Sequence, residues 1–195
     1  MKKIVFGISG KAQHGKDTSA DYLLSILGGK KVHFADKLKE QAVYLGWDGI
    51  KDDGGRKFIQ EMSAPIKEYG NWLAKKYPEK YGHYANYNYY AASLYDEIIN
   101  STENILYIAD VRFLNEFELF KNSNDIIFIS IRVNRVDPKS NLPFDNKLAE
   151  AQKNHSSETE LDNIKMDYTI INSTFEDLYK HLNDITIDLK EKGIL

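Results

Sequence analysis

The sequence predicts an α/β fold in three layers, in which helices cover both faces of a central parallel sheet. Short apolar runs alternate along the chain with segments of helical spacing, and this alternation is typical of strand–helix–strand units with right-handed crossovers. The apolar runs are continuous, as expected for parallel strands that are buried on both faces. The 195 residues contain no low-complexity linker, so 1–195 is expected to form one domain.

Five apolar runs are expected to be strands, because each has about four to eight residues and is rich in Ile, Val, Phe and Tyr. They are 3–9, 32–35, 105–109, 126–133 and 168–171. Six segments carry apolar residues at three- and four-residue steps, which predicts helices with one buried face. They are 16–27, 37–46, 56–76, 89–100, 113–121 and 175–192, and Thr174 is a suitable N-cap for the last.

The composition excludes several classes of protein. With 26 basic and 29 acidic residues the net charge is −3, so DNA or RNA is not expected as the main partner. The absence of cysteine excludes a disulfide scaffold, a thiolate zinc site and a cysteine nucleophile. No apolar run approaches the ~18 residues of a membrane span, and no secretory signal is evident. We therefore expect a cytoplasmic protein with no membrane partner.

The first predicted strand leads directly into a G-x-x-x-x-G-K motif that ends at Lys16. Glycines at both ends allow successive N–H groups to turn inward around a phosphate, and the start of the next helix adds its positive dipole end. Asp17 stands where Ser or Thr usually binds magnesium, and a carboxylate suits that ion as well. The alternative is a glycine-rich turn with an exposed lysine. We assign ATP binding to Gly10, Lys11, His14, Gly15, Lys16, Asp17 and Thr18, with Lys16 also catalytic.

Polar residues also follow the second and third predicted strands, where ligands bind in such sheets. Asp110 is expected to be the second magnesium carboxylate, and Arg112 to hold a substrate phosphate. In the alternative, Asp110 caps the next helix and Arg112 pairs with Glu116. Asp36 is equally suited to capping a helix and to the site, and Lys37 to contacting a phosphate or sugar. Asp36, Lys37, Arg112 and Glu116 are therefore candidate substrate-binding residues.

The chain has 22 lysines but only four arginines, so each arginine is a candidate for bidentate phosphate binding. The alternative is four ordinary surface residues. Arg56 lies in the first turn of a predicted helix, where a cation is unfavourable to the dipole, which suggests a bound substrate anion or an ion pair. Arg132 and Arg135 flank the end of the strand 126–133 and are expected to be catalytic. They begin a polar segment, about 133–158, that predicts a lid.

Five blocks give a resemblance to a known family: GKDTSADYL, HFADKLKE, GGRKFIQEM, IADVRFLNEFE and HSSETEL. Their order resembles that in phage-type deoxynucleoside monophosphate kinases, over residues 3–162. The resemblance implies an adenylate-kinase-like phosphate-loop (P-loop) kinase core, a monophosphate-binding insertion at about 36–100 and a lid. It assigns ATP and magnesium to Gly15–Thr18 and the lid to Arg132 and Arg135. The monophosphate is assigned to Lys37, Arg56 and Arg112, although Lys37 stands where the family often has proline.

These observations together predict a phosphotransferase that moves the γ-phosphoryl group of ATP to a (deoxy)nucleoside monophosphate, with ATP and Mg²⁺ as cofactors. One alternative is a P-loop kinase of another small phosphorylated acceptor. The other is a non-catalytic ATP-binding module, whose partner surface would be the tyrosine-rich segment 77–95. A homodimer is left open. If the gene is carried by a phage, the compartment would be the host cytoplasm.

Overall fold

The strands of the sheet are parallel, so their carboxyl ends lie together along one side of it, here called the carboxyl edge. We describe the sheet from a computed structural model, which covers residues 2–50, 52–80, 89–146, 153–154 and 156–195. In the described part, the strand order is β2-β3-β1-β4-β5. Val5 in β1 pairs with Leu106 and Phe128 in the neighbouring strands, so β1 is central. The strands are β1 (Lys3–Ser9), β2 (Lys30–Val32), β3 (Ile105–Ile108), β4 (Ile126–Arg135) and β5 (Tyr168–Asn172).

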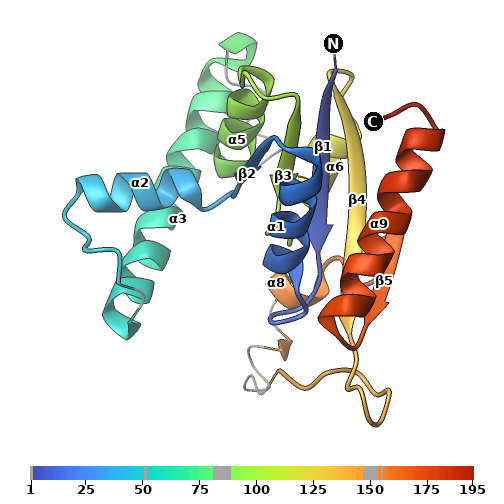
Figure 1. The fold of residues 1–195 in the computed structure, drawn as a ribbon. Helices are drawn as coiled ribbons and strands as arrows, with labels where there is room; N and C mark the ends of the chain where they lie inside the picture. Colours follow the sequence, from blue (N-terminus) through green and yellow to red (C-terminus); the bar gives the residue numbers. More distant parts are fainter. Residues whose placement is uncertain (1, 51, 81–88, 147–152, 155) are drawn as a thin grey trace.

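Helices cover both faces of this sheet. On one face, α1 (Lys16–Leu27) and α9 (Phe175–Glu191) pack on Phe6 and Ile8 of β1. On the other face, α5 (Tyr89–Ile99) and α6 (Leu114–Lys121) pack on Val5. Alternate residues of one strand thus enter two different cores, as period-2 side-chain geometry requires. The arrangement, visible in Figure 1, confirms the predicted three-layer α/β fold.

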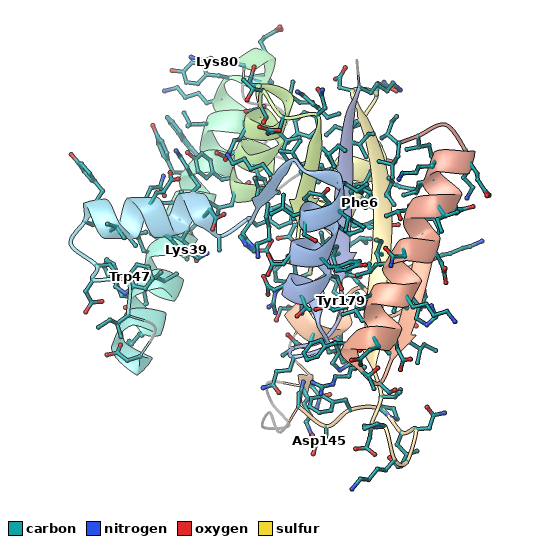
Figure 2. The ribbon with its side chains drawn as sticks, in the orientation of Figure 1. Phe6, Lys39, Trp47, Lys80, Asp145 and Tyr179 are labelled. Carbon is teal, nitrogen blue, oxygen red and sulfur yellow. The ribbon has the colours of Figure 1, made fainter. Side chains whose placement is uncertain are left out.

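Two further helices extend beyond the β2 edge of the sheet. They are α2 (Asp36–Tyr44) and α3 (Asp53–Lys76), and Figure 2 shows Lys39 and Trp47 on this projection, whereas Phe6 lies within the sheet. The short helix α8 (Ser156–Thr159) lies near the carboxyl edge of the sheet. None of the helices in the described ranges is long and apolar enough to cross a membrane.

The observed bounds of β2, β3, β4 and β5 differ by one to three residues from the predicted ranges, and contacts explain two of these differences. The second strand was expected at 32–35 but ends at Val32, because the carboxylates of Asp110 and Asp36 accept the N–H groups of Phe34 (3.3 Å) and His33 (3.0 Å). These bonds turn the chain into α2 and end the ladder with β3. The strand β4 continues to Arg135 because it pairs with β5 up to that residue. Both deviations arise from contacts between segments that sequence periodicity does not record.

Candidate active site

The G-x-x-x-x-G-K motif forms a tight loop between β1 and α1 at the carboxyl edge of the sheet. Gly10 (φ 145°), Gln13 (φ 65°) and Gly15 (φ 101°) all adopt positive φ, and α1 starts immediately after Gly15. The first N–H groups of α1 have no partner within the helix and are available to an anion. Glycine is required at position 10 for a second reason, since a Cβ there would lie 2.3 Å from the carbonyl oxygen of Val133.

We expect Gly10→Ala to destabilise the protein clearly more than Gly46→Ala. Both positions have positive φ, but position 46 has open space around an added Cβ. Backbone strain of about 1–2 kcal/mol is common to both variants, and the contact with Val133 adds about 1–3 kcal/mol at position 10 only. Urea denaturation measures the two free energies of unfolding. Equal losses would show that the loop moves away from β4 at little cost.

Lys16 is buried, and its ammonium group lies against the loop itself. Its side chain is 7% exposed, and Nζ donates hydrogen bonds to the carbonyl oxygens of Gly10 (2.7 Å) and Lys11 (2.9 Å). Burial, and then the neighbouring Arg112 guanidinium, lower the pKa of Lys16 to about 8, against the opposing effect of nearby carboxylates. The ammonium is therefore charged at neutral pH and is held against two carbonyl groups of the loop.

The lowered pKa of Lys16 predicts that ADP affinity falls in alkaline solution. Bound phosphates favour the charged ammonium, so above about pH 8 binding must take up a proton. We expect the Kd for ADP to rise by up to about tenfold per pH unit above that value, measured by calorimetry. The variant Lys16→Met should show no such rise. The same pH profile in the variant would assign the titration to another group.

The predicted magnesium carboxylates lie in different environments. Asp17, in the first turn of α1, is exposed, and its carboxylate lies 3.8 Å from Nζ of Lys31. Asp110 follows β3; its Oδ1 accepts the N–H of Phe34 and lies 3.8 Å from Nδ1 of His33. The contact with Asp110 raises the pKa of His33. Both side chains offer carboxylate oxygens, the ligand type that Mg²⁺ uses, and that ion needs only one or two carboxylates from a protein.

Arg112 is linked to the phosphate loop through Glu158. Its Nη1 donates to Oε1 of Glu158 at 2.9 Å, and Oε2 of the same carboxylate accepts the N–H of Ala12 at 2.8 Å. The Glu158 side chain is only 7% exposed, whereas that of Arg112 is 37% exposed. The structure thus pairs the Arg112 guanidinium with Glu158, in contrast to the Arg112–Glu116 ion pair that the sequence left as an alternative.

The other candidate substrate-binding residues make local contacts. Glu116 is buried and accepts the N–H groups of Arg112 (2.9 Å) and Phe113 (3.1 Å), and burial raises its pKa to about 7. Asp36 accepts the N–H of His33 and pairs with Lys39 at 2.8 Å, and Lys37 pairs with Glu40 at 3.2 Å. Arg56 belongs to α3, but its side chain lies outside the described part of the structure.

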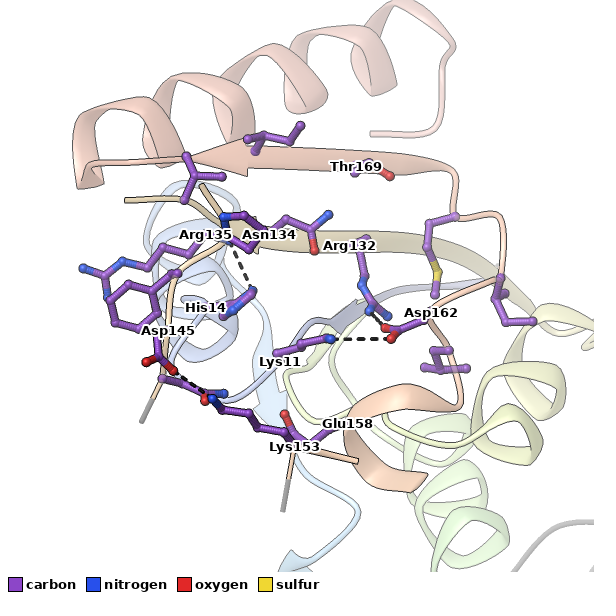
Figure 3. Close-up of a pocket in the computed structure, with 18 residues that line it drawn as sticks. Lys11, His14, Arg132, Asn134, Arg135, Asp145, Lys153, Glu158, Asp162 and Thr169 are labelled. Atoms are coloured by element: carbon purple, nitrogen blue, oxygen red, sulfur yellow. Dashed lines mark hydrogen bonds and ion pairs between the residues drawn. The ribbon is translucent and has the colours of Figure 1, made fainter. Parts of the chain in front are cut away.

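The arginines of β4 face a network of charged and aromatic groups (Figure 3). Arg132 forms an ion pair with Asp162, whose second carboxylate oxygen lies 3.5 Å from Nζ of Lys11. The Arg135 guanidinium lies 4.1 Å from the ring centre of Phe144. Lys11 and Arg132, predicted from separate segments, are thus brought together by one carboxylate.

His14 joins the loop to the end of β4. Its Nδ1 accepts the N–H of Arg135 at 3.2 Å, as Figure 3 shows. Burial, and then the charge of Lys16, lower the pKa of His14 to about 4. The imidazole is therefore neutral at neutral pH and fixes the loop relative to the segment that begins at Arg135.

Two cavities adjoin the loop. The smaller, of about 410 Å³, lies between the first turns of α1 and α9. Its lining includes Lys16, Asp17, Thr18, Arg135, Ser173 and Phe175. The larger, of about 730 Å³, lies between the loop, the end of β4 and the chain that leads to β5 (Figure 3). Its lining includes Lys11, Arg132, Phe144, Glu158, Asp162 and Ile171. Both have the size of small-molecule sites, and His14 and Arg135 line both.

Sequence reasoning missed Glu158, Asp162 and His33. Glu158 ends the predicted lid, about 133–158, and Asp162 follows it. Neither residue has a spacing signal that relates it to the loop. Their partners Ala12 and Arg132 lie 146 and 30 positions away. His33 was assigned to the predicted strand 32–35, and only the fold places it beside Asp110. Residues 81–88, 147–152 and His155 lie outside the described ranges.

Comparison with known proteins gives a structural likeness without a sequence match. No family model matches this sequence, and no curated protein matches it. The structure is similar to a shikimate kinase from Aquifex aeolicus, with a TM-score of 0.50 and 11% identity over 97% of this chain and 98% of that one. It is also similar to TT1252 from Thermus thermophilus, with a TM-score of 0.51 and 15% identity over 96% and 98% of the two chains. The chain therefore has the α/β fold of P-loop kinases.

Proposed function

We propose that the protein transfers the γ-phosphoryl group of ATP to a nucleoside monophosphate, with deoxynucleotides as the first candidates. The observation that carries this proposal is the carboxylate that joins the loop to Arg112. A single carboxylate, that of Glu158, is bound by both the Ala12 N–H and the Arg112 guanidinium. An anion held by the loop is therefore within reach of an arginine suited to a second phosphate.

In this proposal the donor occupies the loop and the smaller cavity. The loop amides and Lys16 hold the β- and γ-phosphates, and the N-terminus of α1 adds its dipole. The cavity between α1 and α9 takes the nucleoside. Magnesium, when bound beside Asp17 and Asp110, would neutralise phosphate charge. The monophosphate binds next to Arg112, and the residues 36–100 supply the remainder of its site, with contributions from Lys37 and Arg56.

Transfer would occur by in-line displacement, in which positioning and charge stabilisation provide the catalysis. Lys16 neutralises the transferring group from the loop side. Arg132 and Arg135 do so from the end of β4, where the predicted lid, about 133–158, begins. For this, the guanidinium of Arg132 leaves Asp162 and binds phosphate. The acceptor monophosphate is already an anion, so no side chain is needed to remove a proton.

The fold also favours a second candidate, a kinase of a different small acceptor, because one similar structure is a shikimate kinase. A coupled assay with ATP, Mg²⁺ and a panel of ribo- and deoxynucleoside monophosphates separates the candidates. Acceleration by one or more monophosphates, which Lys16→Met abolishes, supports the proposal. Turnover with non-nucleotide acceptors only would support the second candidate. ATP binding without any turnover would indicate a non-catalytic module.

A further inference from the structure

The carboxylate of Glu158 accepts hydrogen bonds from two groups that are suited to binding phosphate. One is the main-chain N–H of Ala12, in the middle of the loop (2.8 Å), and the other is Nη1 of Arg112 (2.9 Å). Both are donors of the kind that hold phosphate oxygens in proteins. The Glu158 side chain is 7% exposed, so its carboxylate is buried, whereas the Arg112 side chain remains 37% exposed.

Neighbouring contacts hold Glu158 in this place. Two residues further on, Oε1 of Glu160 accepts the N–H of Leu114 at 2.8 Å. Asp162 then pairs with Arg132, and its other oxygen lies 3.5 Å from Nζ of Lys11. The segment is thus fastened to the first turn of α6, to β4 and to the loop. The position of the Glu158 carboxylate follows from these attachments together with its own two bonds.

Phosphate and Glu158 cannot both use the Ala12 N–H. One N–H group donates one strong hydrogen bond, and a polyphosphate in the loop requires the amides that turn inward. A second anion beside the bound phosphates would also be repelled in a poorly hydrated site. Entry of the donor must therefore displace the carboxylate from Ala12. Entry of an acceptor phosphate at Arg112 competes for the same carboxylate from the other side.

We propose that Glu158 is an internal competitor for phosphate, which either substrate displaces, so that binding of one substrate strengthens binding of the other. This inference rests on the function proposed above. Whichever phosphate arrives first breaks the Ala12–Glu158–Arg112 bridge and leaves the second group free. The coupling is reciprocal by thermodynamic necessity, and coupling between sites is typically about 5- to 150-fold in affinity.

The first test compares Glu158→Gln with Glu118→Gln, which removes the same charge from an exposed position of α6. The probe is the β,γ-imido analogue of ATP with Mg²⁺, and calorimetry gives its Kd without any acceptor. We expect Glu158→Gln to bind the analogue at least about tenfold more tightly than the wild type, because a charged hydrogen-bonding competitor is lost. Glu118→Gln should stay within about threefold of the wild type.

The second test measures coupling. The Kd of the imido analogue is determined with and without each deoxynucleoside monophosphate at saturation. In the wild type, we expect at least one monophosphate to lower the Kd by about fivefold or more, and in Glu158→Gln this effect should largely disappear.

Unchanged or weaker analogue binding by Glu158→Gln would overturn the internal-competitor role while leaving the kinase proposal intact. Coupling of equal size in the wild type and the variant would overturn it as well. If neither protein binds the analogue or inorganic tripolyphosphate, the proposed function fails, and this inference fails with it.

Discussion

Replacement of Lys16 by methionine is expected to lower kcat by about 10²–10³-fold, the usual cost of losing one group that stabilises transition-state charge. The Lys16 ammonium is buried and fixed by the carbonyl oxygens of Gly10 and Lys11, so it needs no reorganisation when charge develops. Methionine has a similar length and no charge. Steady-state assays at saturating ATP and acceptor measure the loss.

The control for Lys16→Met is Lys180→Met, which removes an exposed lysine of α9. It should retain the wild-type rate. Lys16→Met also leaves two loop carbonyl groups without their donor. Circular dichroism and urea denaturation must therefore establish that both variants are folded. A folded Lys16→Met protein with a rate within about threefold of the wild type would remove Lys16 from the mechanism.

Substitution of Arg112 by alanine is expected to lower kcat/KM for the monophosphate by about 10²–10⁴-fold. Two charge-assisted hydrogen bonds to an acceptor phosphate, each of about 1.5–3 kcal/mol, give a loss of this size. The guanidinium is partly exposed and lies 2.9 Å from the Glu158 carboxylate. It is therefore already oriented to donate hydrogen bonds to an anionic oxygen. The assay varies the acceptor at fixed, saturating ATP.

Two comparisons make the result for Arg112 specific. Arg112→Lys keeps the charge but loses the planar, bidentate geometry, so it should recover only a small part of the activity. The KM for ATP should change much less than that for the monophosphate. A change in the KM for ATP alone would instead show that Arg112 binds the donor.

The parts of the fold that the sequence predicts best are those with local signals. The loop from Gly10 to Lys16 was predicted because its glycine spacing lies between an apolar run and a helical pattern. Both glycines of the motif adopt positive φ, as this interpretation requires. The capping of α9 by Thr174, whose Oγ1 accepts the Asp177 N–H at 3.1 Å, is equally local. Signals of this kind need no knowledge of tertiary contacts.

The remainder depends on contacts between distant segments. The second strand ends early because Asp110, 76 positions from Phe34, accepts its N–H. The role of Glu158 was invisible because its partner Ala12 lies 146 positions away. Glu116 was expected to contact the substrate, and its hydrogen bonds to the N–H groups that precede α6 follow from a local capping geometry that the sequence also permits. Residue type suggested the chemistry, but only the fold supplied the pairings.

The bond between His14 and the Arg135 N–H has a consequence for the ring itself. Since Nδ1 accepts that proton donor, the neutral imidazole must carry its own hydrogen on Nε2. With a pKa of about 4, this single tautomer persists throughout the neutral range. Its ¹⁵N resonances would therefore report detachment of β4 from the loop without interference from titration.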